Sequence, residues 1–239
     1  MEKLSIGRVV SETFGIIGRN LVSVGTVAVV ISAVAVLLSH GVSESMGQEE
    51  SSREAVGVAG LIAFVMQTIA TGGITHAAVA DQSGQRVSVG PAFATGLRLT
   101  LPLLGLGLVV GLGVGLASLL LVVPGILLWV RWTVAVPVRV VEGPSTSGSL
   151  QRSSELTLGS RWPLFWLAVL TLVFIAVIQV GAGLLAVLVG ESGLASGLLE
   201  VAASAVNTGV SATGTAVCYM ELRRIREGTT PDQLASVFT

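Results

Sequence analysis

The sequence predicts an all-α, polytopic membrane protein with six transmembrane helices, and three observations support this class. The 239 residues are 52% hydrophobic and only 11% charged, against roughly 25% charged residues in soluble domains. The charged residues are clustered and leave long apolar stretches, of which about 20 residues suffice to cross a bilayer as a helix. Thirty glycines, 5% aromatic residues and no alternation of polarity favour packed helices over a β-barrel. A water-soluble globular protein is excluded.

The first two expected spans lie on either side of an acidic connection. Residues 21–39 form the first apolar run, and we interpret it as a retained span because further hydrophobic runs follow it. Residues 55–80 form the second span. The connection, residues 40–54, contains four glutamates and one arginine and is therefore expected in water.

The remaining expected spans form two further pairs joined by short turns. Pro124 and Gly125 make a turn-forming dipeptide in one pair, and a segment with Gly190 and Gly193 separates the helices of the other. The four spans are 101–123, 125–141, 163–189 and 194–220.

The basic residues predict the orientation, because Lys and Arg in short loops stay on the cytoplasmic side. Of the 13 Lys and Arg residues, Arg53 falls outside and Arg131 within a span when the amino terminus is placed inside; all the others fall on inner segments. Both termini are therefore expected in the cytoplasm. The sequence predicts one membrane domain over residues 1–228 and a cytoplasmic tail over 229–239.

Short amphipathic stretches precede the odd-numbered spans. Within residues 4–18, apolar side chains recur at helical spacing opposite Arg8 and Glu12. Less regular stretches begin near Ser88 and Ser147. We expect interfacial helices on the cytoplasmic side, where basic side chains favour anionic headgroups.

Polar side chains within the expected spans are the first candidate site. Arg131 and Glu200 fall at a similar depth, roughly 10 Å below the outer boundary at 1.5 Å per residue. They are candidates for an ion pair between spans four and six, or for a substrate or proton site; alternatively, Arg131 binds a lipid phosphate. Gln67, Gln179 and Asn207 fall near mid-membrane, as an interhelical network or as packing contacts.

Small residues at four-residue intervals predict close helix packing. Gly107, Gly111 and Gly115 give the third span a face of almost bare backbone, and Ala205 with Gly209 continues the trend in the sixth span. These two faces are candidate mates, within one chain or between two copies.

Several function classes find no support in the sequence. The chain has no phosphate-binding loop, zinc-protease motif, paired cysteines or nucleophile turn, so no catalytic residue is assigned. His76 has no second ligand at metal-binding spacing, and no metal or other cofactor is expected. The net charge of −1 lacks the basic face that a nucleic-acid partner requires.

Three further stretches of the sequence are informative together: residues 124–143, 149–159 and 219–228. They resemble the YciC-like family of bacterial six-span membrane proteins, whose architecture also occurs as the membrane domain of some glycerophosphoryl diester phosphodiesterases. The resemblance implies a multi-pass protein of the bacterial inner membrane. The chain lacks room for the soluble phosphodiesterase domain, so catalysis does not carry over.

Within the first of these stretches, Pro124 and Gly125 would make the outer turn and Pro137 with Glu142 would end span four. Pro137 has no amide hydrogen, so a kink is expected over residues 133–136.

Two functional hypotheses remain open. The first is a noncatalytic scaffold or accessory protein that associates with membrane proteins, a second copy or anionic lipids through its small-residue faces and surface helices. The second is a small transporter or flippase-like protein with a polar site around Arg131 and Glu200. A membrane-associated enzyme of lipid or phosphodiester metabolism is a third class without a catalytic motif.

Overall fold

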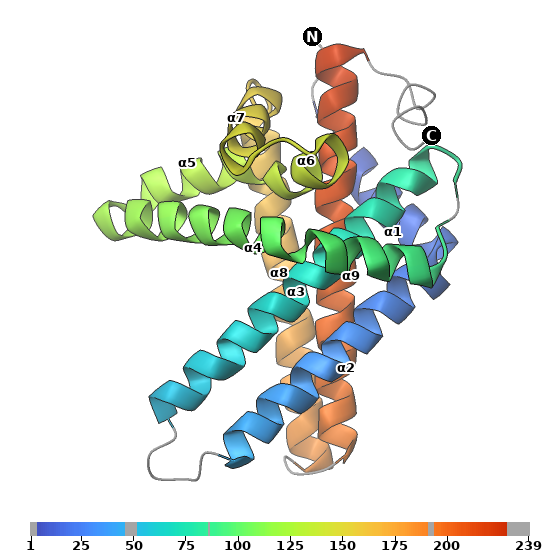
Figure 1. The fold of residues 1–239 in the computed structure, drawn as a ribbon, viewed down its shortest axis with the longest axis vertical. Coiled ribbons are helices and arrows are strands. Elements are labelled where there is room, and N and C mark those ends of the chain that lie inside the picture. Colours follow the sequence, from blue (N-terminus) through green and yellow to red (C-terminus); the bar gives the residue numbers. More distant parts are fainter. Residues whose placement is uncertain (1–3, 46–51, 86, 191–193, 229–239) are drawn as a thin grey trace.

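The computed structural model describes residues 4–45, 52–85, 87–190 and 194–228, and all secondary structure in these ranges is helical (Figure 1). Glu49 and Glu50 of the expected acidic connection lie outside the described residues, as does the expected tail 229–239. The helices are α1 (Ile6–Arg19), α2 (Leu21–Ser45), α3 (Ser52–Gln82), α4 (Val89–Leu120), α5 (Val122–Trp132), α6 (Ala135–Glu142), α7 (Thr146–Leu156), α8 (Arg161–Val189) and α9 (Leu194–Glu227).

Three long hairpins extend from one packed region. Helices α2 with α3, α4 with α5, and α8 with α9 lie against each other in pairs, and the pairs point in different directions (Figure 1). They meet at α1, α6 and α7 and at the adjoining ends of α3, α8 and α9. We call this packed region the base.

The base holds the largest apolar cluster among the described residues. Ile16 of α1, Leu156 of α7, Leu164 of α8 and Tyr219 of α9 are almost completely buried in it. A second cluster joins α2 and α3 to the middle of α9. Helix α9 thus passes through both clusters and is the central element of the fold.

Five segments of the described residues are long and apolar enough to cross a membrane, so the chain has the character of a multi-pass membrane protein. They are Leu21–Gly41, Gly57–Gln82, Val89–Leu120, Val122–Glu142 and Arg161–Val189. The expected sixth span stays a prediction: α9 is long enough but is not among these five. Its many alanine, glycine, serine and threonine residues make it less apolar, and neighbouring helices bury many of its side chains.

The amphipathic stretches fold in three different ways. Residues 4–18 match α1, which turns Val9 and Ile16 into the base core. The stretch near Ser88 forms no separate helix, because α4 continues without a break past Pro102. The stretch near Ser147 is α7, whose N-cap Ser145 accepts a hydrogen bond from the Gly148 amide at 3.2 Å.

The expected kink in span four is confirmed. Helix α5 ends at Trp132 and α6 begins at Ala135, so the break falls at Thr133 and Val134. Pro137 cannot donate to the carbonyl of Thr133, and the helix resumes with the Val138 amide bonded to the Val134 carbonyl at 3.1 Å.

The turn before this span differs from the expectation by a few residues. The chain reverses at Leu121, whose backbone is extended, and Pro124 lies inside the first turn of α5, where its missing amide hydrogen costs nothing. Gly125 allows a close approach of α5 to α4: a Cβ there would lie 1.9 Å from the Ser118 hydroxyl oxygen across the hairpin.

Glycines do bring helices together, but at other positions than expected. A Cβ on Gly96 of α4 would lie 2.3 Å from the carbonyl oxygen of Ile69, and one on Gly73 of α3 would lie 2.6 Å from that of Ala92. Backbones therefore touch where α3 crosses α4. This crossing fixes the second hairpin against the first.

The predicted face of the third span is largely open. A Cβ on Gly107 would meet the Phe64 ring, but Gly111 and Gly115 have nothing within 4 Å. The predicted mate also packs elsewhere, because Ala205 belongs to the cluster with α2 and Gly209 faces Val24. The two small-residue faces are not partners within the chain, since their rotation about the helix axes turns them toward different neighbours.

Candidate functional site

The expected intramembrane ion pair does not form between Arg131 and Glu200. Glu200 instead lies 3.1 Å from the ring Nε2 of His40 on α2. Arg131 stands at the opposite end of the molecule, where α5 reaches the base. Arg131 and Glu200 do not lie at the expected similar depth, because the α4/α5 hairpin is steeply inclined to α9 (Figure 1). Equal distances from a turn therefore do not give equal depths.

Only part of the expected polar network is present. The Thr208 hydroxyl donates to Gln67 Oε1 at 2.9 Å and joins α9 to α3. Asn207 Oδ1 is buried without a hydrogen-bond partner, and Gln179 is exposed on α8. The predicted network residues Gln67, Gln179 and Asn207 therefore do not converge on one site.

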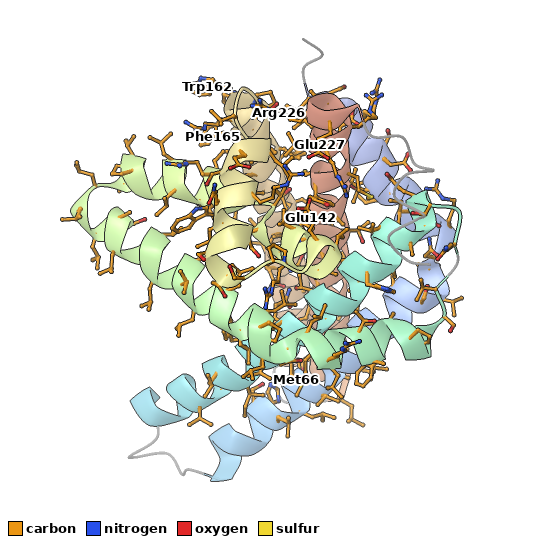
Figure 2. All side chains as sticks on the ribbon, turned by 45° about the horizontal axis from the view of Figure 1, so that its top comes forward. Met66, Glu142, Trp162, Phe165, Arg226 and Glu227 are labelled. Atoms are coloured by element: carbon orange, nitrogen blue, oxygen red, sulfur yellow. The ribbon has the colours of Figure 1, made fainter. Side chains whose placement is uncertain are left out.

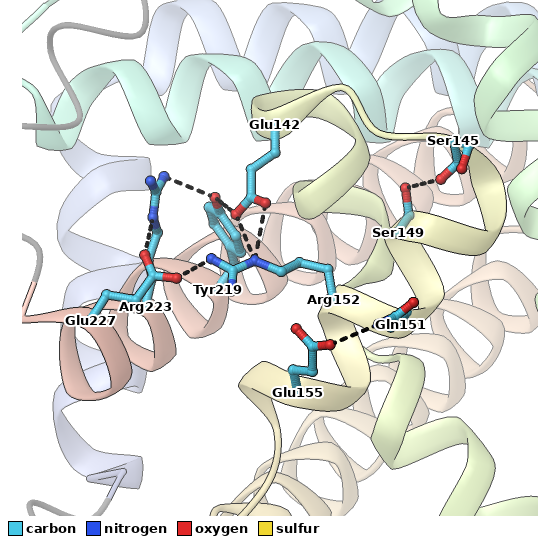
Figure 3. A network of polar contacts seen from close by, with 9 residues as sticks. All are labelled: Glu142, Ser145, Ser149, Gln151, Arg152, Glu155, Tyr219, Arg223 and Glu227. Carbon is cyan, nitrogen blue, oxygen red and sulfur yellow. Dashed lines mark hydrogen bonds and ion pairs between the residues drawn. The ribbon is translucent and has the colours of Figure 1, made fainter.

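A chain of ion pairs closes the base between α6, α7 and α9 (Figure 3). Arg152 donates through Nε to Glu142 Oε2 at 3.1 Å and through its terminal nitrogen to Glu227. Arg223 donates to Glu227 at 2.9 Å, and the buried Tyr219 hydroxyl donates to Glu142 at 2.9 Å. Three helices are thereby fixed relative to each other.

The protonation equilibria of this network follow from its geometry. Partial burial by itself lowers the pKa of the Arg152 guanidinium, but the hydrogen bonds to Glu227 and Glu142 outweigh it and raise the pKa above its usual range. Burial by itself raises the pKa of the Glu227 carboxyl, whereas the bonds from Arg152 and Arg223 lower it, and the pKa ends below its usual range. The carboxylate form of Glu227 is therefore stabilised by the fold.

A second set of ion pairs ties α1 to the base. Arg19 donates to Asp81 at the end of α3, and Asn20 donates to the same carboxylate. At the other end of α1, Arg8 lies 3.0 Å from Glu221 of α9. The polar face of α1 is thus paired to protein, not left free for headgroups alone.

Arg131 lines an open cleft of about 540 Å³ beside the base. The carbonyl of Arg131 accepts a hydrogen bond from the Ser153 hydroxyl at 2.8 Å, which fixes the end of α5 to α7. Arg161, the first residue of α8, lines the same cleft. The full lining is Arg131, Trp132, Leu150, Gln151, Ser154, Glu155, Leu158 and Arg161.

The charges in this cleft do not cancel. Neither guanidinium makes an ion pair or hydrogen bond with the described residues, and Arg161 Nε is buried without a partner. Glu155 is the acidic residue of the lining, and its carboxylate accepts a hydrogen bond from the Gln151 amide at 3.0 Å. The cleft therefore keeps a net positive charge.

An apolar groove of about 590 Å³ adjoins the cleft between α5 and α8. Leu158 and Arg161 line both spaces, so the groove begins where the cleft ends. Its walls are aliphatic and aromatic: Val123, Ile126, Leu127, Val130, Trp162 and Phe165.

All four tryptophans of the chain lie on α5 and α8, the two helices that border the groove. Trp129 and Trp132 are on the last turns of α5, and Trp162 and Trp166 are on the first turns of α8. Trp162 is 74% exposed, and it lies at the same end of the molecule as Arg226 and Glu227 (Figure 2). Exposed tryptophans are typical of the membrane–water interface.

A separate cavity of about 340 Å³ lies between α1, α5, α8 and α9. Most of its lining is apolar, and five hydroxyl-bearing residues also line it: Thr13, Thr133, Thr171, Ser211 and Thr215. No group of three or more metal-binding side chains occurs in the described part of the chain.

Sequence patterns identified Arg131 and Glu142 as candidate site residues but not Arg152, Arg161 or the α9 residues that complete the base. A signal was available for part of it, because Tyr219, Arg223 and Glu227 recur every four residues and share one helix face. No local pattern connects these residues to Arg152.

Comparisons of the chain with models of known protein families, with curated proteins and with solved structures found no match in any of the three.

Proposed function

We propose that this chain is a noncatalytic integral membrane protein that acts as a scaffold or accessory subunit and associates with other membrane proteins or lipids. The observation that supports it is the contrast between base and hairpins. The base is closed by buried apolar contacts and ion pairs, whereas the most apolar 18-residue stretch of α8 has none of its residues buried in the chain. The base thus holds hairpins whose exposed apolar side chains are available to other membrane proteins or to lipids.

The proposed setting is the bacterial inner membrane, with α9 as a sixth crossing and both termini in the cytoplasm. The ion-paired base carries most basic residues of the described chain, which favours the cytoplasmic side for it. Membership of the YciC-like family belongs to the same proposal and rests on the three resembling stretches.

The scaffold proposal is tested by native mass spectrometry of the protein gently extracted from its own membrane. The expected spectrum contains a stoichiometric second protein or a second copy. A lone chain that retains a specific solute would contradict the proposal and favour the transporter hypothesis.

Site-specific photo-crosslinking in membranes locates the contact. A photoreactive residue at Leu188, which is 81% exposed on α8, should capture a protein partner; one at Leu164, which is 2% exposed in the base, should not. Equal crosslinking at both positions, or none at Leu188, would contradict an interface on the third hairpin.

Orientation is tested by single-cysteine labelling with an impermeant thiol reagent in intact cells. A cysteine at Glu49 should react and a cysteine at Gly228 should not, because the first is expected outside and the second inside. The reverse pattern would overturn the topology.

A further inference from the structure

We propose that the cleft between Arg131 and Arg161, with the groove beside it, is a binding site for an anionic phospholipid. The headgroup phosphate would lie between the two guanidinium groups and an acyl chain along the groove. The inference deepens the proposed function, on which it rests, by naming the class of lipid and the residues that bind it.

The guanidinium groups of Arg131 and Arg161 have no partner of opposite charge among the described residues. The two arginines share one cleft. A guanidinium at membrane depth or at its boundary is costly unless it is paired or reaches polar surroundings. Arginine presents parallel donors that match the oxygens of a phosphate, so a phosphodiester anion completes this site.

The apolar groove that continues from the cleft favours a ligand with a hydrocarbon chain. The cleft combines charged and polar residues with apolar ones, whereas the groove beyond Leu158 and Arg161 is lined mainly by aliphatic and aromatic side chains. A free phosphate or a soluble phosphate ester would leave that groove unfilled. A phospholipid places a charged group and a hydrocarbon chain at adjacent positions, as the cleft and groove require.

The position of Arg161 beside exposed tryptophans also favours a lipid headgroup. Trp162 and Trp166 are exposed on the first turns of α8, next to Arg161. Because tryptophan favours the headgroup level of a bilayer, Arg161 stands where lipid phosphates lie.

The walls of the cleft are fixed before any lipid binds. The Ser153 hydroxyl fixes the Arg131 carbonyl at 2.8 Å, and Arg226 of α9 donates to the Leu158 carbonyl. The turn between α7 and α8 is completed by Gly159, whose φ of +82° is accessible to glycine at little cost. A preorganised site loses less entropy on binding.

The test measures lipid retention by the full-length protein in mild detergent, using native mass spectrometry. Phosphatidylglycerol and phosphatidylcholine with the same acyl chains are titrated in parallel. Wild-type protein should retain more phosphatidylglycerol than phosphatidylcholine. The double variant Arg131→Gln with Arg161→Gln should bind it about tenfold more weakly for each arginine removed, because each loses charge-assisted hydrogen bonds.

Arg98→Gln is the matched control, since Arg98 is an exposed arginine on α4 outside the cleft and the groove. It should leave retention unchanged. Glu155→Gln should strengthen retention, because it removes the negative charge of the lining while an amide oxygen can still accept from Gln151. Thermal unfolding without added lipid confirms that each variant is folded.

Three results would overturn the site: equal retention by wild type and a folded double variant, an equal loss in Arg98→Gln, or equal affinity for phosphatidylcholine. Displacement of the lipid by millimolar glycerol phosphate would assign the cleft to a soluble phosphate ester instead. None of these results removes a protein partner from the native spectrum, and loss of the partner leaves lipid retention measurable, so the two proposals fail separately.

Discussion

Replacing Gly96 by alanine should destabilise the protein, because the added methyl group has no room at the crossing of α3 and α4. The new Cβ would lie 2.3 Å from the carbonyl oxygen of Ile69 and 3.1 Å from the amide nitrogen of Gly73, so the two backbones must separate by about 1 Å. Such overpacking costs up to about 3 kcal/mol, and the better helix propensity of alanine offsets about 1 kcal/mol. The expected net loss in the free energy of unfolding is about 2 kcal/mol.

The assay is unfolding of purified protein in mild detergent by titration with sodium dodecyl sulfate, followed by far-ultraviolet circular dichroism. Gly111→Ala is the matched control, because it adds the same methyl group to the same helix where nothing lies within 4 Å. It should leave stability unchanged or slightly increased. The reasoning is refuted if Gly96→Ala unfolds at the wild-type midpoint, or if Gly111→Ala loses as much stability, which would restore the predicted face as the packing face.

Three further predictions concern the ion-paired base. Arg152→Gln should lower the free energy of unfolding by roughly 1.5–3 kcal/mol in the same detergent titration, because Glu142 and Glu227 each lose a charged donor; a midpoint equal to that of Arg98→Gln would contradict this. Tyr219→Phe should cost about 1–2 kcal/mol, since the buried hydroxyl donates to Glu142, and an unchanged midpoint would show that this bond is not stabilising. Because the pKa of Glu227 is lowered in the folded protein, its stabilisation is complete above the unfolded-chain pKa of about 4.3 and is lost as the pH falls through the folded pKa. The midpoints of wild type and Glu227→Gln should therefore differ at pH 7 and converge in acid; a constant difference down to pH 3 would contradict the assignment.

The sequence predicted the elements better than their contacts. The break at Thr133 and Val134 followed from Pro137, and α1 followed from its spacing of apolar residues, because both depend on neighbours within one or two turns. The sixth span was expected from an apolar run and stays a prediction, because α9 is not among the five helices that are long and apolar enough to cross a membrane.

The candidate site was predicted only in part. Arg131 was identified from its unusual depth and remains part of the proposed lipid site, but its expected partner Glu200 lies with His40 instead. Arg161 was counted only among the basic residues of the inner segments. Its role depends on the packing of α8 beside α5, which brings Arg161 into the same cleft as Arg131, thirty positions earlier in the chain.

The amino-acid sequence by itself determined the helical class and the order of the long helices along the chain. In an apolar solvent every backbone amide must bond within its own segment, so hydropathy and turn-forming residues fix where helices begin and end. Only the tertiary structure decided which helices cross, which glycines allow contact and which charges meet. The reason is that lipid tails and protein interiors are similarly apolar, so hydropathy does not distinguish a side chain that faces lipid from one that faces another helix.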